Sequence, residues 1–289
     1  MNFTRGEELL ALCGEQKLCI HEVMLKREVE LTSLSDVAIY AKLNESLSIM
    51  KKAVLQGLTS DIKSVSGLIG GDAKKVKEKS ERVKSVCGLL MSKAISRSMA
   101  VLEVNAAMGK IVAAPTAGSS GIVPGVLLTV AEEFALSEDS LFKGLLTAGA
   151  VGMLITRNAT VAGAEGGCQA ETGSAAAMAA AAVVEMLGGS PAAALHAGAI
   201  CLQNVLGLVC DPVAGLVEVP CEHRNALGAA NALISAEMAL AGVVSVIPFD
   251  EVVEAMYRVG KSLPCELRET ALGGLAGTPT GQRIKRELF

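Results

Sequence analysis

Large aromatic side chains are almost missing from this chain of 289 residues. It contains no Trp, two Tyr and five Phe, whereas hydrophobic residues make up 51% of the sequence. A core built around bulky rings is therefore excluded, and the apolar volume must come mainly from Ala, Leu and Val. Small side chains let helices approach one another closely. The composition thus predicts tightly packed helices.

An excess of positive charge is also absent. The formal net charge is −4, and the lysines near position 75 (Lys74, Lys75, Lys77 and Lys79) are interspersed with Asp and Glu. This mixture is typical of a solvated helix face. A nucleic-acid-binding surface would need a basic patch or stripe, so we expect no nucleic-acid partner.

The N-terminus lacks the apolar core of a signal peptide, because MNFTRGEELLALCGEQ has no long apolar run after a basic region. Residues 226–249 are long enough to span a bilayer. They contain Asn231 and Glu237, however, and no aromatic belt or basic flanks. We interpret them as a buried helix and expect a cytoplasmic protein that inserts in no membrane.

Apolar residues recur at helical spacing over most of the chain. No long linker or internal repeat divides it, so we predict one compact, mainly α domain over residues 1–289, with a more charged helical portion over 1–100. The expected helices cover 7–13 (ended by Gly14), 20–29, 34–58 (capped by Ser35 or Asp36), 74–108, 123–133, a stretch from a Ser174 cap to 187, a helix after Ser190-Pro191, 226–246, and 248–260 (capped by Asp250).

Two glycine-rich stretches separate the early helices. Residues 59–73 are polar and predict either a plain loop or a mobile loop over a site. Residues 109–125, GKIVAAPTAGSSGIVPG, begin with a short apolar run that could be a strand or an extended segment. The tight loop at 115–121 offers hydroxyls and backbone N–H groups before a helix, which favours anions. It matches no Walker or GxGxxG motif, so an anion pocket and an ordinary turn both stay open.

The eight cysteines are the remaining chemical signal. A reduced compartment excludes a disulfide framework, which leaves buried thiols, nucleophiles or metal ligands. Cys13, Cys87 and Cys201 fall in helical runs and are expected in the core, and Cys265, after a proline, is ambiguous. By contrast, three cysteines lie where glycine or proline breaks the pattern.

These three are Cys168, Cys210 and Cys221. Residues 201–225 form a stiff proline-containing loop with Cys210-Asp211-Pro212 and Pro220-Cys221. Residues 163–173 are broken by glycines, and we expect them to expose the thiol of Cys168. The spacing is neither a CxxC zinc pattern nor a ferredoxin run, so spacing alone leaves metal binding open. An iron–sulfur cluster held by three thiolates has one open iron, which is a Lewis acid.

Several long motifs resemble the α chain of the iron–sulfur L-serine dehydratases: GAEGGCQAETGSA, GLVCDPVAGLVEVPCEHRNALGAANA, KIVAAPTAGSSGIVPG, GLIGGDAKKV and TALGGLAGTPTG. The resemblance covers nearly the whole chain. It implies a largely helical fold, a [4Fe–4S] cluster held by Cys168, Cys210 and Cys221, and conversion of L-serine to pyruvate and ammonia. Single-chain members carry an additional β portion, so a separate β subunit and an oligomer are expected.

The substrate carboxylate then has candidate partners in the anion loop, namely Thr116, Gly118, Ser119 and Ser120, with Asn105 as a further pocket residue. The catalytic base is not identified. His196 and His223 are weak candidates, and the base could come from the β chain. Single-chain relatives have a Glu-His pair where this chain has Gln203 and Asn204, and some end in a cysteine where this chain ends in Phe289.

Three other functions are considered. An L-cysteine desulfidase would use the open iron on a thiol, and a non-catalytic subunit would only bind the cluster. A pyridoxal phosphate dehydratase needs a lysine Schiff base. No lysine occurs between Lys143 and Lys261, and only Lys110 lies near the glycine loop, which argues against this last class.

Overall fold

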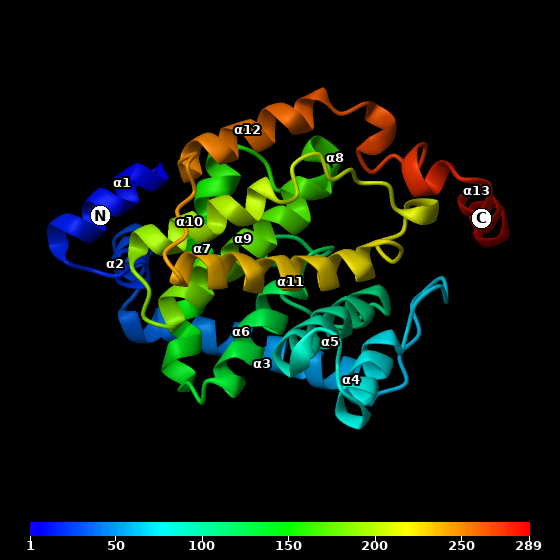
Figure 1. The fold of residues 1–289 in the computed structure, drawn as a ribbon, viewed down its shortest axis with the longest axis horizontal. Helices are drawn as coiled ribbons and strands as arrows, with labels where there is room; N and C mark the ends of the chain where they lie inside the picture. The colour runs from blue at the N-terminus through cyan, green and yellow to red at the C-terminus, as the bar shows by residue number, and fades with distance from the viewer.

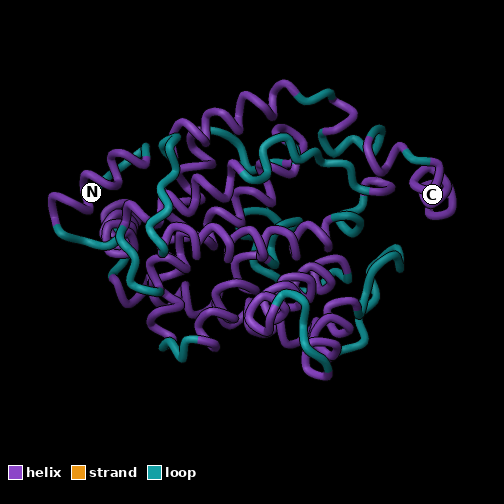
Figure 2. Tube along the Cα trace, in the orientation of Figure 1, coloured by secondary structure: helices purple, strands orange, loops and turns teal.

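The computed structural model describes residues 1–289 and contains α-helices but no β-strand (Figure 2). The mainly α prediction is therefore confirmed. The helices are α1 (Gly6–Gln16), α2 (Ile20–Thr32), α3 (Asp36–Thr59), α4 (Asp72–Arg82), α5 (Gly88–Ala106), α6 (Ile122–Glu133), α7 (Glu138–Asn158), α8 (Gly163–Gly166), α9 (Cys168–Met186), α10 (Pro191–Gln203), α11 (Cys221–Leu240), α12 (Phe249–Ser262) and α13 (Pro279–Leu288), with short 3₁₀ turns at Val213–Gly215, Cys265–Leu267 and Gly274–Gly277.

Helix α9 is the centre of the bundle (Figure 1). It packs against α6, α7, α10 and α11. Its sequence from Ala175 to Val184 is almost entirely alanine, and all of these residues are buried. A helix that is apolar all round belongs in a protein interior. The near absence of large side chains is what lets four helices surround it, as the composition predicts.

Three helices have their first N–H groups capped by a carboxylate from another helix, which is distant in sequence for α1 and α2 and the next in the chain for α4. Glu185 of α9 accepts from the backbone N–H groups of Ile20 and His21, both at 3.1 Å, at the start of α2. Glu103 of α5 caps the start of α4 in the same way. Asp250 of α12 accepts from Gly6 N at 2.7 Å and from the next residue at 3.0 Å, at the start of α1. These contacts satisfy the free donors of a helix N-terminus and join different helices.

Asp250 therefore corrects one prediction, because it caps α1 and not its own helix, whose N-cap is Pro248. Gly14 does not end the first helix, which continues to Gln16 and stops at Lys17 in the left-handed region (φ 54°). Ser174 is not a cap either, because it lies inside α9. The caps at Ser35 and Ser190 are confirmed by hydrogen bonds from the N–H groups three residues later.

Segment boundaries differ in two further places. The helix expected over 74–108 is interrupted at 83–87, between α4 and α5. Of the two alternatives for residues 111–114, only the strand is excluded, because they form neither strand nor helix. The helix expected over 226–246 is α11, which begins at Cys221 and ends at Leu240. No helix in the structure is long and apolar enough to cross a membrane.

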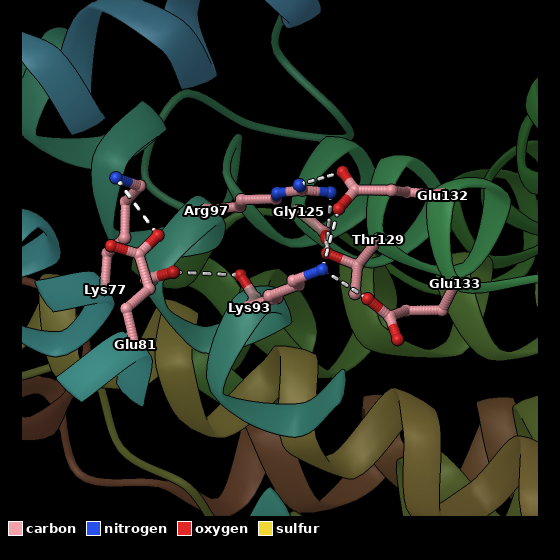
Figure 3. Close-up of polar contacts among 9 residues, drawn as sticks. Lys77, Glu81, Lys93, Arg97, Gly125, Thr129, Glu132 and Glu133 are labelled. Atoms are coloured by element: carbon pink, nitrogen blue, oxygen red, sulfur yellow. Dashed lines mark hydrogen bonds and ion pairs between the residues drawn. The ribbon is translucent and has the colours of Figure 1, made fainter. Parts of the chain in front are cut away.

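Helices α5 and α6 are joined on their outer side by a small ionic network (Figure 3). Lys93 pairs with Glu132 at 2.7 Å and also with Glu133. Arg97 pairs with Glu132 and donates to Thr129 Oγ1 at 3.3 Å. Exposed ion pairs contribute little individually, so the close fit of the two helices must come from the packing behind this network.

That packing depends on two glycines in α6 and the turn before it. A Cβ on Gly125 would lie 2.2 Å from Ser98 Oγ and 2.7 Å from Ser98 N, and one on Gly121 would lie 1.9 Å from Ser98 O. The backbone of α5 thus lies directly against the start of α6. This contact fixes where the 115–121 loop ends.

We predict that Gly125→Ala destabilises the protein by about 1–3 kcal/mol through overpacking against α5. Gly149→Ala is the matched control, because a Cβ there meets only the Met24 methyl at 4.0 Å within a helix. In the control, alanine should stabilise by up to about 1 kcal/mol through helix propensity. Denaturant unfolding of both variants measures the difference. Equal effects of the two substitutions would contradict the packing argument.

Candidate metal centre

The three cysteines singled out above are buried, with exposed fractions of 1% for Cys168, 2% for Cys210 and 5% for Cys221. Two of them lie at helix starts and not in loops: Cys168 is the first residue of α9 and Cys221 the first residue of α11. The expectation that the glycine break exposes Cys168 is therefore wrong. The break ends at Gly167, whose φ of 75° turns the chain directly into α9.

Cys210 lies in the loop between α10 and α11 and is held by the C-terminal segment. Its N–H donates to Leu267 O at 2.8 Å, and its carbonyl accepts from Glu269 N at 2.7 Å. This short parallel pairing, a single bridge between Cys210 and Arg268, holds the tail against the backbone of a buried cysteine. The tail is therefore part of the wall of the site.

A buried glutamine joins the same loop to α9. The side chain of Gln169 donates to Gly166 O at 2.9 Å and to Met256 O at 3.0 Å, and accepts from Gly207 N at 2.9 Å. Its own N–H donates to Leu208 O. Every polar atom of this side chain is bonded, so the positions of Cys168 and of the loop that leads to Cys210 are fixed relative to each other.

Cys168 Sγ, Cys210 Sγ and one carboxylate oxygen of Glu171 all lie within 4.8 Å of one another. Glycine makes this possible, because a Cβ on Gly163 would lie 2.9 Å from Cys210 Sγ and 3.4 Å from Glu171 Oε2. The Cys221 thiol does not fall inside that 4.8 Å group. It borders the same site, and Asn225, one turn later, links it to the loop described below.

The thiols differ in their affinity for protons. A hydrogen bond from Cys210 and the charge of Arg224, whose Nη1 donates to Cys168 Sγ at 3.2 Å, lower the pKa of Cys168 despite its burial. The hydrogen bond to Cys168 and burial raise the pKa of Cys210, and burial raises that of Cys221. Only one thiolate is thus stabilised by the protein itself. A metal that binds all three must displace protons from the other two.

Arg224 is oriented by a second contact. Its Nη2 donates to Asp211 Oδ1 at 2.6 Å, and Asp211 Oδ2 accepts from Leu275 N at 2.7 Å. Asp211, next to Cys210, and Arg224, three residues after Cys221, therefore form an ion pair. This buried ion pair joins two of the three cysteine segments and directs its positive charge at the third.

The 115–121 loop lies against Glu171. Thr116 Oγ1 donates to the Glu171 carboxylate and lies 2.9 Å from Ser119 Oγ. Asn225 accepts from Gly121 N at 3.0 Å and donates to Gly118 O at 2.7 Å and Cys221 O at 2.9 Å. The loop and the start of α11 are thereby fixed together beside the thiols.

Donors remain available in this loop. The backbone N–H groups of Thr116, Ala117 and Gly118 donate to no group of the chain, and the buried hydroxyl of Ser120 has no partner. A carboxylate is the kind of ligand that such free donors bind. Of the predicted substrate-binding residues, the structure thus brings Thr116, Gly118, Ser119 and Ser120 to the site.

The other predicted residues lie elsewhere or make no contact with this group. Asn105 is half-buried in the last turn of α5 and forms no side-chain hydrogen bond. His223 is exposed. His196 lines a pocket with residues of α1 and α12, none of which belongs to the thiol site. The structure therefore gives neither histidine a contact with the thiols.

Glu171 and Arg224 were not predicted as site residues, although the sequence carries a signal for both. Each lies three residues after a site cysteine, a spacing that places side chains on one helix face. The signal is readable only if Cys168 and Cys221 are recognised as helix starts. Burial raises the pKa of Glu171, which marks it as part of the enclosed site.

The chain is similar to known proteins over most of its length. Residues 15–276 match the family described as serine dehydratase alpha chain. The chain is 50% identical to the probable L-serine dehydratase, alpha chain, of Bacillus subtilis over 287 residues (99% of this chain, 95% of the relative). It is 49% identical to the L-serine dehydratase, alpha chain, of Peptoniphilus asaccharolyticus over 284 residues (98% and 97%). It is 38% identical to the L-serine dehydratase of Streptomyces coelicolor, covering 95% of this chain and 60% of that longer relative.

A match over this length, together with near-complete coverage of relatives of the same size, shows that this chain belongs to the serine dehydratase alpha chain family.

Proposed function

We propose that this chain is the α subunit of an L-serine dehydratase that converts L-serine to pyruvate and ammonia with a [4Fe–4S] cluster. The observation that carries the proposal is the enclosure of Cys168, Cys210 and Cys221 beside a loop with free N–H donors. Family membership and the names of the relatives support the substrate.

The donor set fits an iron–sulfur cluster. Thiolates are the ligands that such clusters take, and carboxylate or imidazole sites select other metals. The glycine at position 163 leaves space beside Cys210, and Arg224 supplies positive charge next to Cys168. Of the remaining cysteines, Cys265 is exposed and Cys201 is fully buried in the core. When bound by three thiolates, a [4Fe–4S] cluster has one open iron that supplies Lewis acidity toward a hydroxyl group.

The chain's own residues bind and orient the substrate. The free N–H groups at 116–118 and the hydroxyls of Ser119 and Ser120 are placed to hold the serine carboxylate. Overall, the Cα proton and the β-hydroxyl leave as water, the aminoacrylate tautomerises to an imine, and water returns to release ammonia and pyruvate. The group that takes the Cα proton is not assigned to a residue of this chain.

A β subunit is the proposed partner. The two relatives of similar length are named alpha chains, and the longer Streptomyces relative has about 40% of its length outside the match. A second chain would supply the corresponding portion, and the catalytic base is expected there or at the interface. The working enzyme is thus expected to be a hetero-oligomer.

We predict that Cys168→Ala, Cys210→Ala and Cys221→Ala each abolish retention of the cluster after anaerobic reconstitution, since each removes one of only three ligands. Iron and sulfide should fall from four of each per chain to near zero in the variants. Cys265→Ala, which changes an exposed thiol, is the control and should retain both. Full retention in all three site variants would refute the proposal.

We further predict that Ser119→Ala and Ser120→Ala, which remove the two hydroxyls assigned to the substrate carboxylate, raise the KM for L-serine by about tenfold each, the effect of losing one hydrogen bond to a charged group. Activity is measured as pyruvate release by the reconstituted complex, with hydrogen sulfide release from L-cysteine measured in parallel. Thr59→Ala, at the exposed end of α3, serves as the control. An unchanged KM in both site variants would refute the assignment of these residues to the substrate carboxylate. If L-cysteine is turned over faster than L-serine, L-cysteine is the preferred substrate.

A further inference from the structure

A second group of acidic side chains includes Glu222, the residue after Cys221. Asp72 at the start of α4, Glu103 of α5 and Glu222 of α11 place one carboxylate oxygen each within 4.8 Å of one another. Glu103 is fully buried, and Glu222 is 1% exposed. No sulfur or imidazole belongs to this group, so its chemistry differs from that of the thiol site.

The buried oxygens of this group are not satisfied by the protein. Glu103 Oε1 accepts from Asp72 N at 2.7 Å and Ala73 N at 2.9 Å, but its Oε2 has no partner. Neither oxygen of Glu222 has a partner. The nearest lysine contact is peripheral, because Lys75 is 75% exposed and reaches only Asp72, at 2.6 Å.

Two other glutamates of the structure, by contrast, have both carboxylate oxygens hydrogen-bonded. Glu218, also buried, accepts from the hydroxyls of Ser64 and Ser66 and from Ser66 N, so both of its oxygens are bonded. Glu185 likewise binds the start of α2 with both oxygens. An unpaired buried carboxylate is costly. Two of them facing each other therefore require positive charge between them.

We propose that Asp72, Glu103 and Glu222 bind one divalent cation that prefers oxygen ligands, such as Mn²⁺, Mg²⁺ or Ca²⁺. Carboxylate oxygens are the usual ligands of these hard cations. Two oxygens bound to one such ion lie at most about 4–5 Å apart, and the three carboxylate oxygens meet that limit because they lie within 4.8 Å of one another.

The alternative source of positive charge is a proton shared by the two glutamates. Without a cation, burial and the neighbouring Glu103 raise the pKa of Glu222 to about 9. A proton serves only the Glu103–Glu222 pair, whereas a cation also engages Asp72. Asp72→Asn should therefore weaken the binding of a cation but leave a proton shared by the two glutamates in place.

The position of the site gives the cation a structural task. It joins the first turn of α4, the last turn of α5 and the first turn of α11, where Cys221 precedes Glu222. A cation there would hold the start of α11 against α5 independently of any cluster. The inference thus stands even if the iron–sulfur proposal fails.

The test is a titration of the full-length reconstituted protein with Mn²⁺, in which electron paramagnetic resonance measures the concentration of free Mn²⁺. Mg²⁺ and Ca²⁺ are then added as competitors. The expected result is one Mn²⁺ per chain, with affinity reduced at least about tenfold in Glu222→Gln and Glu103→Gln, since ligand charge sets affinity. Gln keeps an acceptor oxygen for the start of α4. Glu218→Gln is the matched control, because it neutralises a buried glutamate outside the group.

Asp72→Asn, at a half-buried position, provides a second variant should the glutamate variants fail to fold. It should also weaken Mn²⁺ binding, and saturating Mn²⁺ should raise the Tm of the wild type more than that of this variant. No binding to the wild type, or equal binding to the wild type and to every folded variant, would overturn the proposal. A third outcome would also overturn it. If neither the wild type nor Glu222→Gln binds Mn²⁺ and the variant is the more stable of the two, Glu103 and Glu222 share a proton and bind no cation.

Discussion

The burial of α9 on all sides is the constraint on which the rest of the structure depends. Its alanines allow α7, α10 and α11 to approach closely, and this packing fixes the position of the helix start. Cys168 is the first residue of that helix and Glu171 lies one turn later. A helix buried on all sides therefore carries Cys168 and Glu171 in its first turn, which is the placement that a preorganised site requires.

Carboxylates from other helices add a second level of organisation. Glu185 and Asp250 use both oxygens to cap helices on the side away from the thiols. Glu103 uses only one for α4 and has its second oxygen free inside the protein. The difference between these caps separates a purely structural carboxylate from one that is available to a ligand. Glu222, which belongs to the same acidic group as Glu103, lies next to Cys221 in the first turn of α11.

The sequence was sufficient to predict the helical fold and most helix positions, because helical periodicity is a local signal. The glycine and proline breaks singled out the three cysteines, whose role as ligands stays a prediction. It was insufficient for the details of the site. Cys168 and Cys221 were expected in loops, since glycine and proline before a cysteine indicate a break but do not show where the next helix begins. Glu171 and Arg224 become apparent only with the correct helix start. The pairing of Cys210 with residues 267–269 is a long-range contact that no local pattern predicts.

This pairing has a consequence for synthesis of the protein. The partner of Cys210 is Arg268, about 100 residues after Cys168. At a translation rate of roughly 5–20 residues per second, Cys168 leaves the ribosome about 5–20 s before the tail that closes the site. Until residues 267–269 are made and folded, Cys210 lacks its backbone partners. The thiols made before that point are therefore open to solvent and to oxidants during synthesis.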